Sequence, residues 1–424
     1  MLKIPPIACA AAFLIAVALL TSGTHVLAAT QESVLDNFAH TQDGALPAAA
    51  LIFDSSGNLY GTTVAGGSDT TGTAFQLVPS SDGTWTENVL HSFSHTSNDG
   101  WQPEAGLALD KDGNLYGTTL YGGAYCTDQG GCGSVFELSP GSNGTWTEKL
   151  LHSFCARSRC ADGNFPYGGV ILDAAGNLYG TTSSGGEHNG GTVFAMTHSK
   201  KGWTENVLYS FAAFRGDGSQ PRAELIFDRS GNLYGTTYAG GASHYGTVFE
   251  LTPGAKGTWK ERVLYSFTGS GADGANPWSA LVMDAAGDLY GTTLFGGCSD
   301  YGCGTVFEMV MRKNGTRTEK VLFDLCTTST CPGGSYPRGG VVLDSKNNLY
   351  GTTTEGGAYY YGTAFELTSD REGNWSETVL HSFPSSETDG FTPESALVLG
   401  GDGKVYGTTA SCEDGNGSVF EISF

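Results

Sequence analysis

One short phrase, Asn-Leu-Tyr-Gly-Thr-Thr in its commonest form, recurs seven times along the chain and constrains the fold more than any other feature. Its tyrosines follow one another at intervals of 55 to 63 residues, and they are Tyr60, Tyr116, Tyr179, Tyr234, Tyr290, Tyr350 and Tyr406. Self-similarity at a nearly fixed period is typical of solenoids and propellers, in which one structural unit is built several times. We therefore interpret the 424 residues as repeats of one unit rather than as two or three unrelated domains.

Each copy contains four β-like runs in a fixed order. The first is an apolar stretch that usually ends in Asp, such as residues 51–54, and the second is the Leu-Tyr-Gly-Thr-Thr run. The third resembles residues 246–251 and the fourth resembles residues 85–93. Runs of β-branched and aromatic residues at these lengths, bounded by Gly, Asn, Asp and Pro, predict strands. Tight turns join the first run to the second and the third to the fourth, so the two longer, variable connections should share the opposite face, which we call the variable-loop face.

The arrangement of these sheets follows from their apolar faces and from the two ends of the chain. The fourth runs carry apolar residues on both faces, so each sheet needs cover on both sides, which radial stacking supplies. Residues 31–38 match a fourth run, whereas the last copy stops after its third run. We therefore predict an all-β, seven-bladed β-propeller over residues 29–424, with four antiparallel strands per blade. The N-terminal strand should complete blade 7 as its outer strand and so close the ring.

The repeated phrase also carries a family resemblance. Gly-Asn-Leu-Tyr-Gly-Thr-Thr, followed by Gly-Gly and then by Gly-Thr-Val-Phe-Glu-Leu, resembles the GloVer-type tandem repeat of exported bacterial proteins. The resemblance extends over essentially the whole chain after its first 28 residues. It implies a secreted, propeller-like repeat protein and brings no catalytic residues with it.

Residues 1–28 are typical of a secretory signal peptide. Lys3 supplies the positive charge, residues 7–20 the apolar run, and Val26-Leu27-Ala28 a small-residue cleavage site. The run is short for a membrane crossing and no second apolar stretch follows, so we expect no membrane span. We expect export to the extracellular space or the periplasm.

Cysteines occur in the variable connections, and eight of the nine that follow residue 28 form short-range pairs. In an exported protein such pairs favour disulfides. Zinc is the rival interpretation, but no histidine stands at ligand spacing and the gaps do not match Cys-x-x-Cys, so we expect no metal. Exchanged partners, such as Cys126 with Cys155, stay open, and Cys412 is left over. The expected disulfides are Cys126–Cys132, Cys155–Cys160, Cys298–Cys303 and Cys326–Cys331.

Charge and motif content exclude several classes of function. The formal charge is −22, from 43 acidic and 21 basic side chains, which argues against binding of a nucleic-acid backbone. The sequence holds no Gly-x-Ser-x-Gly elbow, no phosphate-binding loop and no dinucleotide fingerprint, so we expect no cofactor.

Residues that recur in every copy are interpreted as structural. The Asp of the first turn could be a calcium ligand and the Glu of the fourth run could be catalytic, but a single site does not need seven copies of either. The aspartates are Asp54, Asp110, Asp173, Asp228, Asp284 and Asp344, with Gly400 at this position in the seventh copy, and the glutamates are Glu32, Glu87, Glu148, Glu205, Glu261, Glu319 and Glu377.

The candidate site lies where the copies differ, at the motif Asp-Gly-x-x-Pro before each first run, from which Gly333-Gly334-Ser335-Tyr336-Pro337 is the one departure. The first strand of a propeller blade is the innermost, so the residue after this Pro should stand at the mouth of the central channel. In blade order this first ring is Ala48, Glu104, Tyr167, Arg222, Trp278, Arg338 and Glu394. Two places further on, the second ring is Ala50, Gly106, Gly169, Glu224, Ala280, Gly340 and Ala396. Glu224 is the exception in a ring of otherwise small residues.

The first ring suggests a binding function. Glu104 and Glu394 lie on one side, and Arg222 and Arg338 flank Trp278 on the other, which could hold a sugar or a zwitterionic ligand. The rival interpretation is a solvated rim that tolerates any polar residue. The expected ligand-binding residues are Glu104, Tyr167, Arg222, Glu224, Trp278, Arg338, Glu394 and Trp101.

Three functions are compatible with these patterns. The leading hypothesis is a monomeric, secreted binding module that recognises carbohydrate or protein through its variable-loop face and is not an enzyme. The alternative is a carbohydrate-active hydrolase or lyase at the channel mouth, and it predicts a desolvated Glu224 beside an arginine with a shifted pKa. Its residues would be Glu104, Glu224, Glu394, Arg222 and Arg338. The third is a structural extracellular repeat protein.

Overall fold

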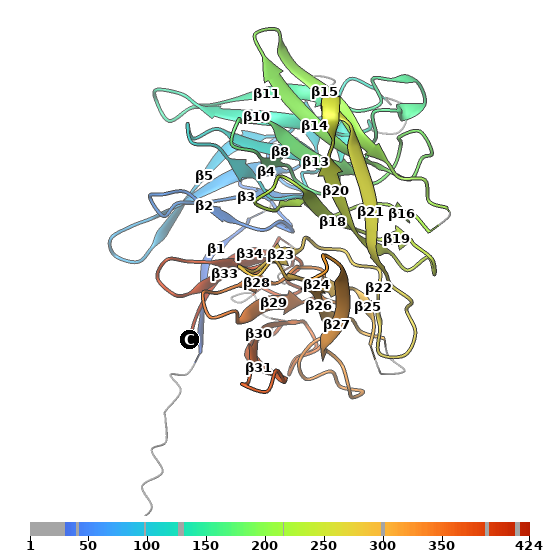
Figure 1. Ribbon diagram of the computed structural model, residues 1–424. Helices are drawn as coiled ribbons and strands as arrows, with labels where there is room; N and C mark the ends of the chain where they lie inside the picture. The colour runs from blue at the N-terminus through green and yellow to red at the C-terminus, as the bar shows by residue number, and fades with distance from the viewer. Residues whose placement is uncertain are drawn as a thin grey trace, which may run out of the picture.

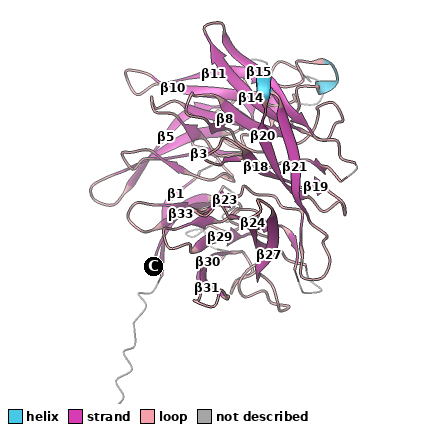
Figure 2. Ribbon diagram, in the orientation of Figure 1, coloured by secondary structure: helices cyan, strands magenta, loops and turns pink. Residues whose placement is uncertain are grey.

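The computed structural model describes residues 30–39, 42–96, 99–125, 131–214, 216–297, 302–385, 390–411 and 416–424. Seven four-stranded antiparallel sheets are arranged radially as a β-propeller (Figure 1), as the repeat predicts. Figure 2 shows how little of the described chain is helical. The two helical segments given for the described residues are the 3-10 turns η2 (Ser158–Cys160) and η3 (Ala255–Gly257). None of the described residues form a helix with the length and apolarity that a membrane crossing requires.

In blades 1 to 6 the strands run from the channel outwards in sequence order. Blade 1 is β2 (Ile52–Phe53), β3 (Leu59–Thr63), β4 (Thr73–Pro79) and β5 (Trp85–Ser92). Blade 2 is β7 (Ala108–Leu109), β8 (Leu115–Thr119), β10 (Ser134–Pro140) and β11 (Trp146–Ser153). Blade 3 is β12 (Ile171–Leu172), β13 (Leu178–Thr182), β14 (Thr192–Ser199) and β15 (Gly202–Ser210). Blade 4 is β17 (Ile226–Phe227), β18 (Leu233–Thr237), β20 (Thr247–Pro253) and β21 (Trp259–Ser266).

Blades 5 and 6 follow the same order, whereas in blade 7 the N-terminal strand of the chain is the outermost. Blade 5 is β23 (Val282–Met283), β24 (Leu289–Thr293), β26 (Thr305–Met311) and β27 (Arg317–Asp324). Blade 6 is β28 (Val342–Leu343), β29 (Leu349–Thr353), β30 (Thr363–Ser369) and β31 (Trp375–Ser382). Blade 7 is β32 (Val398–Leu399), β33 (Val405–Thr409), β34 (Ser418–Ser423) and β1 (Gln31–Asn37). Three two-stranded sheets lie in the variable connections: β6 (Gly100–Trp101) with β9 (Tyr121–Gly122), β16 (Gly218–Ser219) with β19 (Ala239–Gly240), and β22 (Gly274–Ala275) with β25 (Phe295–Gly296).

The N-terminal strand closes the ring. β1 pairs antiparallel with β34, from Gln31 opposite Ser423 to Asn37 opposite Ser418, with a bulge between Val34 and Asp36. Figure 1 shows the blue β1 beside the last blade. The predicted outer strand of blade 7 is thus confirmed, and the ring leaves no unpaired edge on β34.

Aromatic rings pack each blade against the next. The Phe of each third run is fully buried, and in six of the seven interfaces it meets the Phe that follows the outer strand of the preceding blade edge to face, at 5.0 to 5.2 Å between ring centroids. Phe38 and Phe75 make this contact where the ends of the chain meet. The Gly of Leu-Tyr-Gly-Thr-Thr lies against the same ring, as Gly61 does against Phe75, so a side chain there would overlap it.

The repeated first-turn Asp is a turn residue. In blade 1, Asp54 accepts hydrogen bonds from the backbone N–H groups of Ser56 and Asn58, from Asn58 Nδ2 and from the Tyr60 hydroxyl, at 2.7 to 3.1 Å. Burial opposes ionisation of Asp54, but these hydrogen bonds outweigh it and hold the pKa of the carboxyl below its ordinary value. The same pattern recurs at Asp110, Asp173, Asp228 and Asp344. All acceptor capacity is therefore spent within the turn, which agrees with a structural role.

The Thr-Thr pair locks each blade to the next at the channel. The hydroxyl of the first Thr donates to the carbonyl that lies between the two ring positions of the following blade, as Thr62 Oγ1 does to Ala105 O at 3.0 Å. The series closes with Thr408 Oγ1 donating to Ala49 O at 3.4 Å, from blade 7 to blade 1. The same dipeptide that identifies the repeat therefore fixes the backbone that carries the candidate site.

Candidate functional site

The first-ring and second-ring residues line a single cavity at the channel. The cavity has a volume of about 150 Å³, and all fourteen predicted ring positions contribute to its wall. The residues between the two rings, such as Ala49 and Ala223, are buried, whereas the ring residues themselves are half-buried or small. This alternation is what an extended segment with a period of two produces.

A residue with a strained backbone lies two positions before each first-ring residue. The residue before the Pro of this motif has a left-handed backbone in all seven copies, the departing copy at 333–337 included, with φ between 55° and 59°. These residues are Leu46, Gln102, Phe165, Gln220, Asn276, Tyr336 and Thr392. The backbone N–H of each donates a hydrogen bond to a carbonyl of the preceding blade, as Gln220 N does to Gly190 O at 2.8 Å. A left-handed non-glycine residue costs about 1 kcal/mol, so a conformation repeated seven times indicates a constraint that the fold imposes.

Arg222 is enclosed by aromatic rings. Its guanidinium carbon lies 5.0 Å from the ring centroid of Tyr167, 4.4 Å from that of Tyr238 and 4.3 Å from that of Trp278. The rings also contact one another edge to face, Tyr238 with Trp278 at 5.5 Å and Tyr167 with Trp278 at 6.3 Å. We call Tyr167, Tyr238 and Trp278 the aromatic cage.

The cage leaves the polar groups of Arg222 without protein partners. Within the described ranges Arg222 makes no hydrogen bond or ion pair, and its Nε is buried and unsatisfied. Burial lowers the pKa of the guanidinium. The group still carries its charge at neutral pH because the pKa of arginine is far above 7. A half-buried cation whose N–H donors have no protein partner is a binding feature rather than a packing feature.

The second arginine is engaged differently. Arg338 Nη1 donates to Glu394 Oε1 at 2.6 Å, and its guanidinium carbon lies 5.6 Å from the ring centroid of Trp278. Glu104 makes no hydrogen bond with a described residue, and burial first, then the charge of Glu394, raises its pKa despite both arginines. The two arginines therefore face one indole, with the carboxyl groups of Glu104 and Glu394 near them.

Glu224 lies deeper and apart from these charges. Burial alone raises the pKa of its carboxyl to about 7. Its Oε1 occupies space next to the backbone of Gly169, and a side chain at Gly106 would also approach it. Glu224 is thus desolvated, as the enzyme hypothesis requires, but Arg222 turns to the aromatic cage and Arg338 to Glu394 instead of lying beside it.

The repeats of this chain match a known family of repeats. The model of the Gloeobacter/Verrucomicrobia repeat matches residues 22–226 and 205–420. The chain belongs to this repeat family. No curated protein sequence matches it.

A solved structure has a fold similar to that of this repeat-family member at low identity. A Bacteroides uniformis protein, provisionally assigned as a 6-phosphogluconolactonase, is 14% identical, with a TM-score of 0.53 over 85% of this chain and 90% of its own. A Thermus thermophilus protein provisionally assigned as an oxidoreductase (glucose dehydrogenase) has a TM-score of 0.43 at 14% identity, over 93% of this chain and 100% of its own. At these identities the likeness concerns the fold alone.

One residue of the cage, Tyr238, is not among the expected ligand-binding residues, and one expected residue, Trp101, lies elsewhere. Tyr238 directly follows the Thr-Thr pair of blade 4, a position that is Val64, Leu120 and Ser183 in blades 1 to 3. Aligning that position across the copies would have singled it out. Trp101 does not line the channel cavity and instead stacks on Tyr121 at 4.7 Å between ring centroids.

Two larger cavities lie among the described residues at the opposite, tight-turn face, and a third, of about 240 Å³, lies in the variable connections beside Cys303 and Tyr336. One of about 560 Å³ between blades 2 and 3 includes Asp110, Glu137, Lys149 and Trp203. The Asp110 carboxylate is committed to its turn, and Glu137 Oε2 lies 3.7 Å from Lys149 Nζ. Its charged groups therefore have partners, unlike those of Arg222.

Two of the four expected disulfides of this repeat-family member are present, Cys155–Cys160 and Cys326–Cys331. Cys126, Cys298 and Cys412 lie outside the described residues, so the other two pairings stay predictions. The sulfur atoms of Cys132, Cys155 and Cys160 lie within 4.8 Å of one another, and so do those of Cys303, Cys326 and Cys331. A soft metal could use such sulfurs only after the disulfide is reduced.

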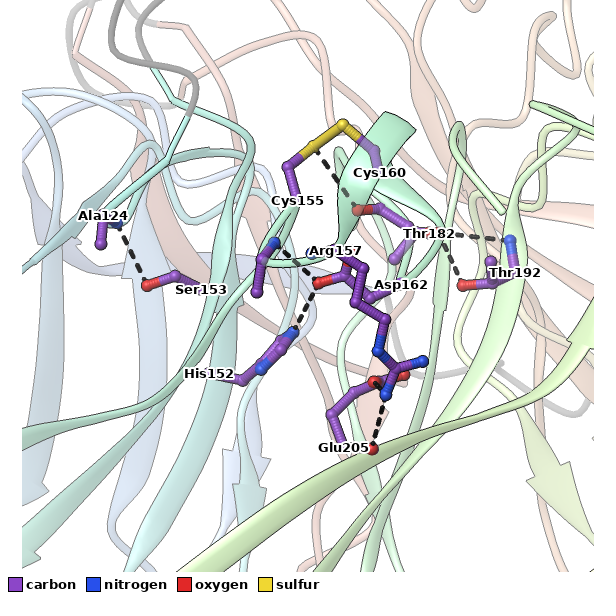
Figure 3. A network of polar contacts seen from close by, with 12 residues as sticks. Ala124, His152, Ser153, Cys155, Arg157, Cys160, Asp162, Thr182, Thr192 and Glu205 are labelled. Atoms are coloured by element: carbon purple, nitrogen blue, oxygen red, sulfur yellow. Dashed lines mark hydrogen bonds and ion pairs between the residues drawn. A yellow bond between two sulfur atoms is a disulfide. The ribbon is translucent and has the colours of Figure 1, made fainter. Parts of the chain in front are cut away.

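The loop that carries Cys155–Cys160 is also fixed by polar contacts (Figure 3). The buried Asp162 accepts hydrogen bonds from the backbone N–H groups of Ala156 and Arg157, at 3.0 and 3.1 Å, and lies 3.2 Å from His152 Nε2. Arg157 Nη2 reaches Glu205 of blade 3 at 2.7 Å. The loop therefore ties blade 2 to blade 3.

Proposed function

We propose that this chain is an exported binding module that recognises a carbohydrate or protein ligand at the channel mouth on its variable-loop face. The observation that carries the proposal is Arg222, a cation whose N–H groups have no protein partner within the described ranges although three aromatic rings fix its position. Preorganised donors of this kind favour binding because little entropy is lost when a ligand arrives.

Export is part of the proposal. Residues 1–28 have the features of a signal peptide, the repeat family is one of exported proteins by resemblance, and Cys155–Cys160 and Cys326–Cys331 suit an oxidising compartment. Mass spectrometry of protein collected from the medium or the periplasm would test the cleavage after residue 28.

A second candidate function, a carbohydrate-active hydrolase or lyase, is favoured by Glu224. A carboxyl whose pKa burial raises to about 7 can donate and accept a proton at neutral pH. Binding leads because no described cation accompanies Glu224, whereas the donors of Arg222 are already in place.

The experiment is a glycan-array and peptide-array screen of the exported chain, with Trp278→Ala to open the aromatic cage. Binding that is lost in this variant supports the binding module. Incubation of each bound glycan with the protein, read by release of reducing ends, tests catalysis, which Glu224→Gln should abolish while leaving binding in place. Absence of both binding and turnover would leave the structural repeat protein as the remaining interpretation.

A further inference from the structure

We infer that the channel mouth selects an acidic saccharide and that Arg222 binds the carboxylate of its terminal sugar. This inference rests on the proposed binding function and names the ligand class for the same site. It follows from what the aromatic cage leaves exposed, from the charges around it and from the size of the cavity.

The aromatic cage presents a guanidinium edge rather than a free aromatic face. Trp278 has Arg222 over its ring at 4.3 Å and Arg338 at 5.6 Å, and both tyrosines of the cage also contact Arg222. Stacking of a neutral sugar on Trp278 would compete with these cation–π contacts, which strengthen when the cation is desolvated. What remains for a ligand is the row of N–H donors of Arg222, whose planar fork matches a carboxylate.

The neighbouring carboxyl groups favour a singly charged ligand with hydroxyl groups. Arg338 is neutralised by Glu394 at 2.6 Å, which leaves Arg222 as the cation available to a ligand. A sulfate or phosphate with two charges would meet Glu104 and Glu394 at close range, whereas a carboxylate would balance Arg222 alone. Sugar hydroxyls can donate to Glu104 and Glu394, since Glu104 has no other partner in the described part of the chain.

The size of the cavity limits the ligand to a terminal residue. A volume of about 150 Å³ admits one sugar ring partly inserted and cannot hold an internal segment of a polysaccharide. Below the first ring, the cavity is lined by the second-ring glycines and alanines and by Glu224. The remainder of a chain would therefore leave over the variable-loop face.

The test is calorimetric titration of the exported chain with D-glucuronate and D-galacturonate, and with D-glucose and D-galactose as neutral counterparts. We expect the uronates to bind with a Kd of about 1 mM, because a single sugar offers few atoms for contact. The neutral sugars should bind at least about tenfold more weakly. Arg222→Gln should weaken uronate binding by about 10- to 100-fold, because it removes a charge-assisted hydrogen-bonded pair.

The matched control is Arg262→Gln, which removes the same charge from the same blade. Arg262 pairs with Glu250 outside the channel cavity, so uronate binding should change by less than about twofold in this variant. Arg222→Lys keeps the charge but loses the planar fork, and we expect an intermediate loss. Circular dichroism of each variant shows that the fold is retained.

Three outcomes would overturn the inference, and they separate it from the proposed function. Equal binding of neutral sugars with no effect of Arg222→Gln would reject the acidic ligand and leave the carbohydrate-binding module standing. Tighter binding of inorganic sulfate or phosphate than of uronate would reject the carboxylate. Binding of an acetylated peptide with a free C-terminal carboxylate, in the absence of any uronate binding, would reject the saccharide and indicate a protein ligand.

Discussion

The side chain of Glu224 occupies the space that a side chain at Gly169 would need. Oε1 of Glu224, in blade 4, lies so close to the backbone of Gly169, in blade 3, that a Cβ there would overlap it. The small second ring therefore does more than taper the channel, because one of its glycines creates the position of the carboxyl. Sequence reasoning placed both residues in one ring, and the structure adds that they are complementary.

Gly169→Ala should consequently destabilise the propeller by about 1 to 3 kcal/mol through overpacking. Glu224→Ala should remove the part of that cost that its Oε1 causes, although the Gly106 carbonyl oxygen would still lie 2.9 Å from the new Cβ, so the double variant is expected to be more stable than the sum of the single changes allows. Urea denaturation followed by tryptophan fluorescence measures all three variants. Additive effects would show that Glu224 moves freely away from Gly169. Gly176→Ala, at a turn with open space beside it but a positive φ, separates overpacking from backbone strain.

Protonation of Glu224 makes stability depend on pH. Burial raises the pKa of its carboxyl from 4.5 to about 7 in the folded chain. The folded state therefore binds the proton more tightly, and this contribution is complete below about pH 4.5 and is lost as the pH rises through about 7. Glu224→Gln imitates the protonated form, so it should be more stable than the native chain at pH 8, by up to about 3 kcal/mol, and similar to it at pH 4.5. Denaturation midpoints at the two pH values check this, and a pH-independent difference would contradict it.

The outer-strand glutamates should add to the same trend. Burial first, and then the charge of Asp99, raises the pKa of Glu148 to about 7. Burial together with Asp36 and Asp43 raises that of Glu87 to about 8. Both shifts are upward, so the protein should lose stability between pH 5 and pH 8, and Glu148→Gln should reduce that loss. Thermal melting across this range is the measurement, with the exposed Glu372→Gln as the control.

The fold was predictable because the residues that specify it recur in every repeat. The site was only partly predictable because its residues differ from blade to blade. Seven copies of one phrase fixed the strands, the turns and the ring closure by residues 31–38. The period-two alternation after each Pro also placed the ring positions around one cavity. Arg222 could be assigned to the channel from spacing alone.

The residues that contact Arg222 depend on the directions of their side chains, which the spacing of residues in the sequence does not determine. Tyr238 enters the cage from a neighbouring connection, where only comparison of single positions across blades reveals it. Arg338 pairs with Glu394 in the next blade, and no sequence rule decides between that pair and one with Glu224. The buried Asp162 stabilises a loop by accepting hydrogen bonds from backbone N–H groups. The identity of the residue alone does not predict these contacts.

Removal of residues 30–38 should expose the whole edge of β34. β1 contributes the pairing from Gln31–Ser423 to Asn37–Ser418 and the Phe38 ring that covers Phe75. An unpaired strand edge beside an uncovered aromatic ring promotes association, so the truncated chain should form dimers or larger species and melt at a lower temperature. Size-exclusion chromatography with light scattering measures this. A monomer of unchanged stability would show that β1 does not close the ring in solution. Phe38→Ala in the full chain separates the two contributions, since it keeps the strand pairing and loses only the ring.

Asp162 should matter more to the loop between blades 2 and 3 than the disulfide does. The Cys155–Cys160 bridge closes a loop of six residues, and the chain-entropy model gives so short a loop about 2 kcal/mol. Asp162→Ala leaves the backbone N–H groups of Ala156 and Arg157 and the ring of His152 without their acceptor, at a cost of about 1 to 3 kcal/mol for each group that stays buried. Denaturation of Asp162→Ala, of the Cys155→Ser/Cys160→Ser pair and of their combination checks the order. We expect the combined variant to be less destabilised than the sum, because either change already loosens the same loop. Asp82→Ala, at an exposed turn, controls for the loss of a carboxylate. A larger effect of the cysteine pair than of Asp162→Ala would mean that the disulfide, and not the buried carboxylate, holds blade 2 to blade 3.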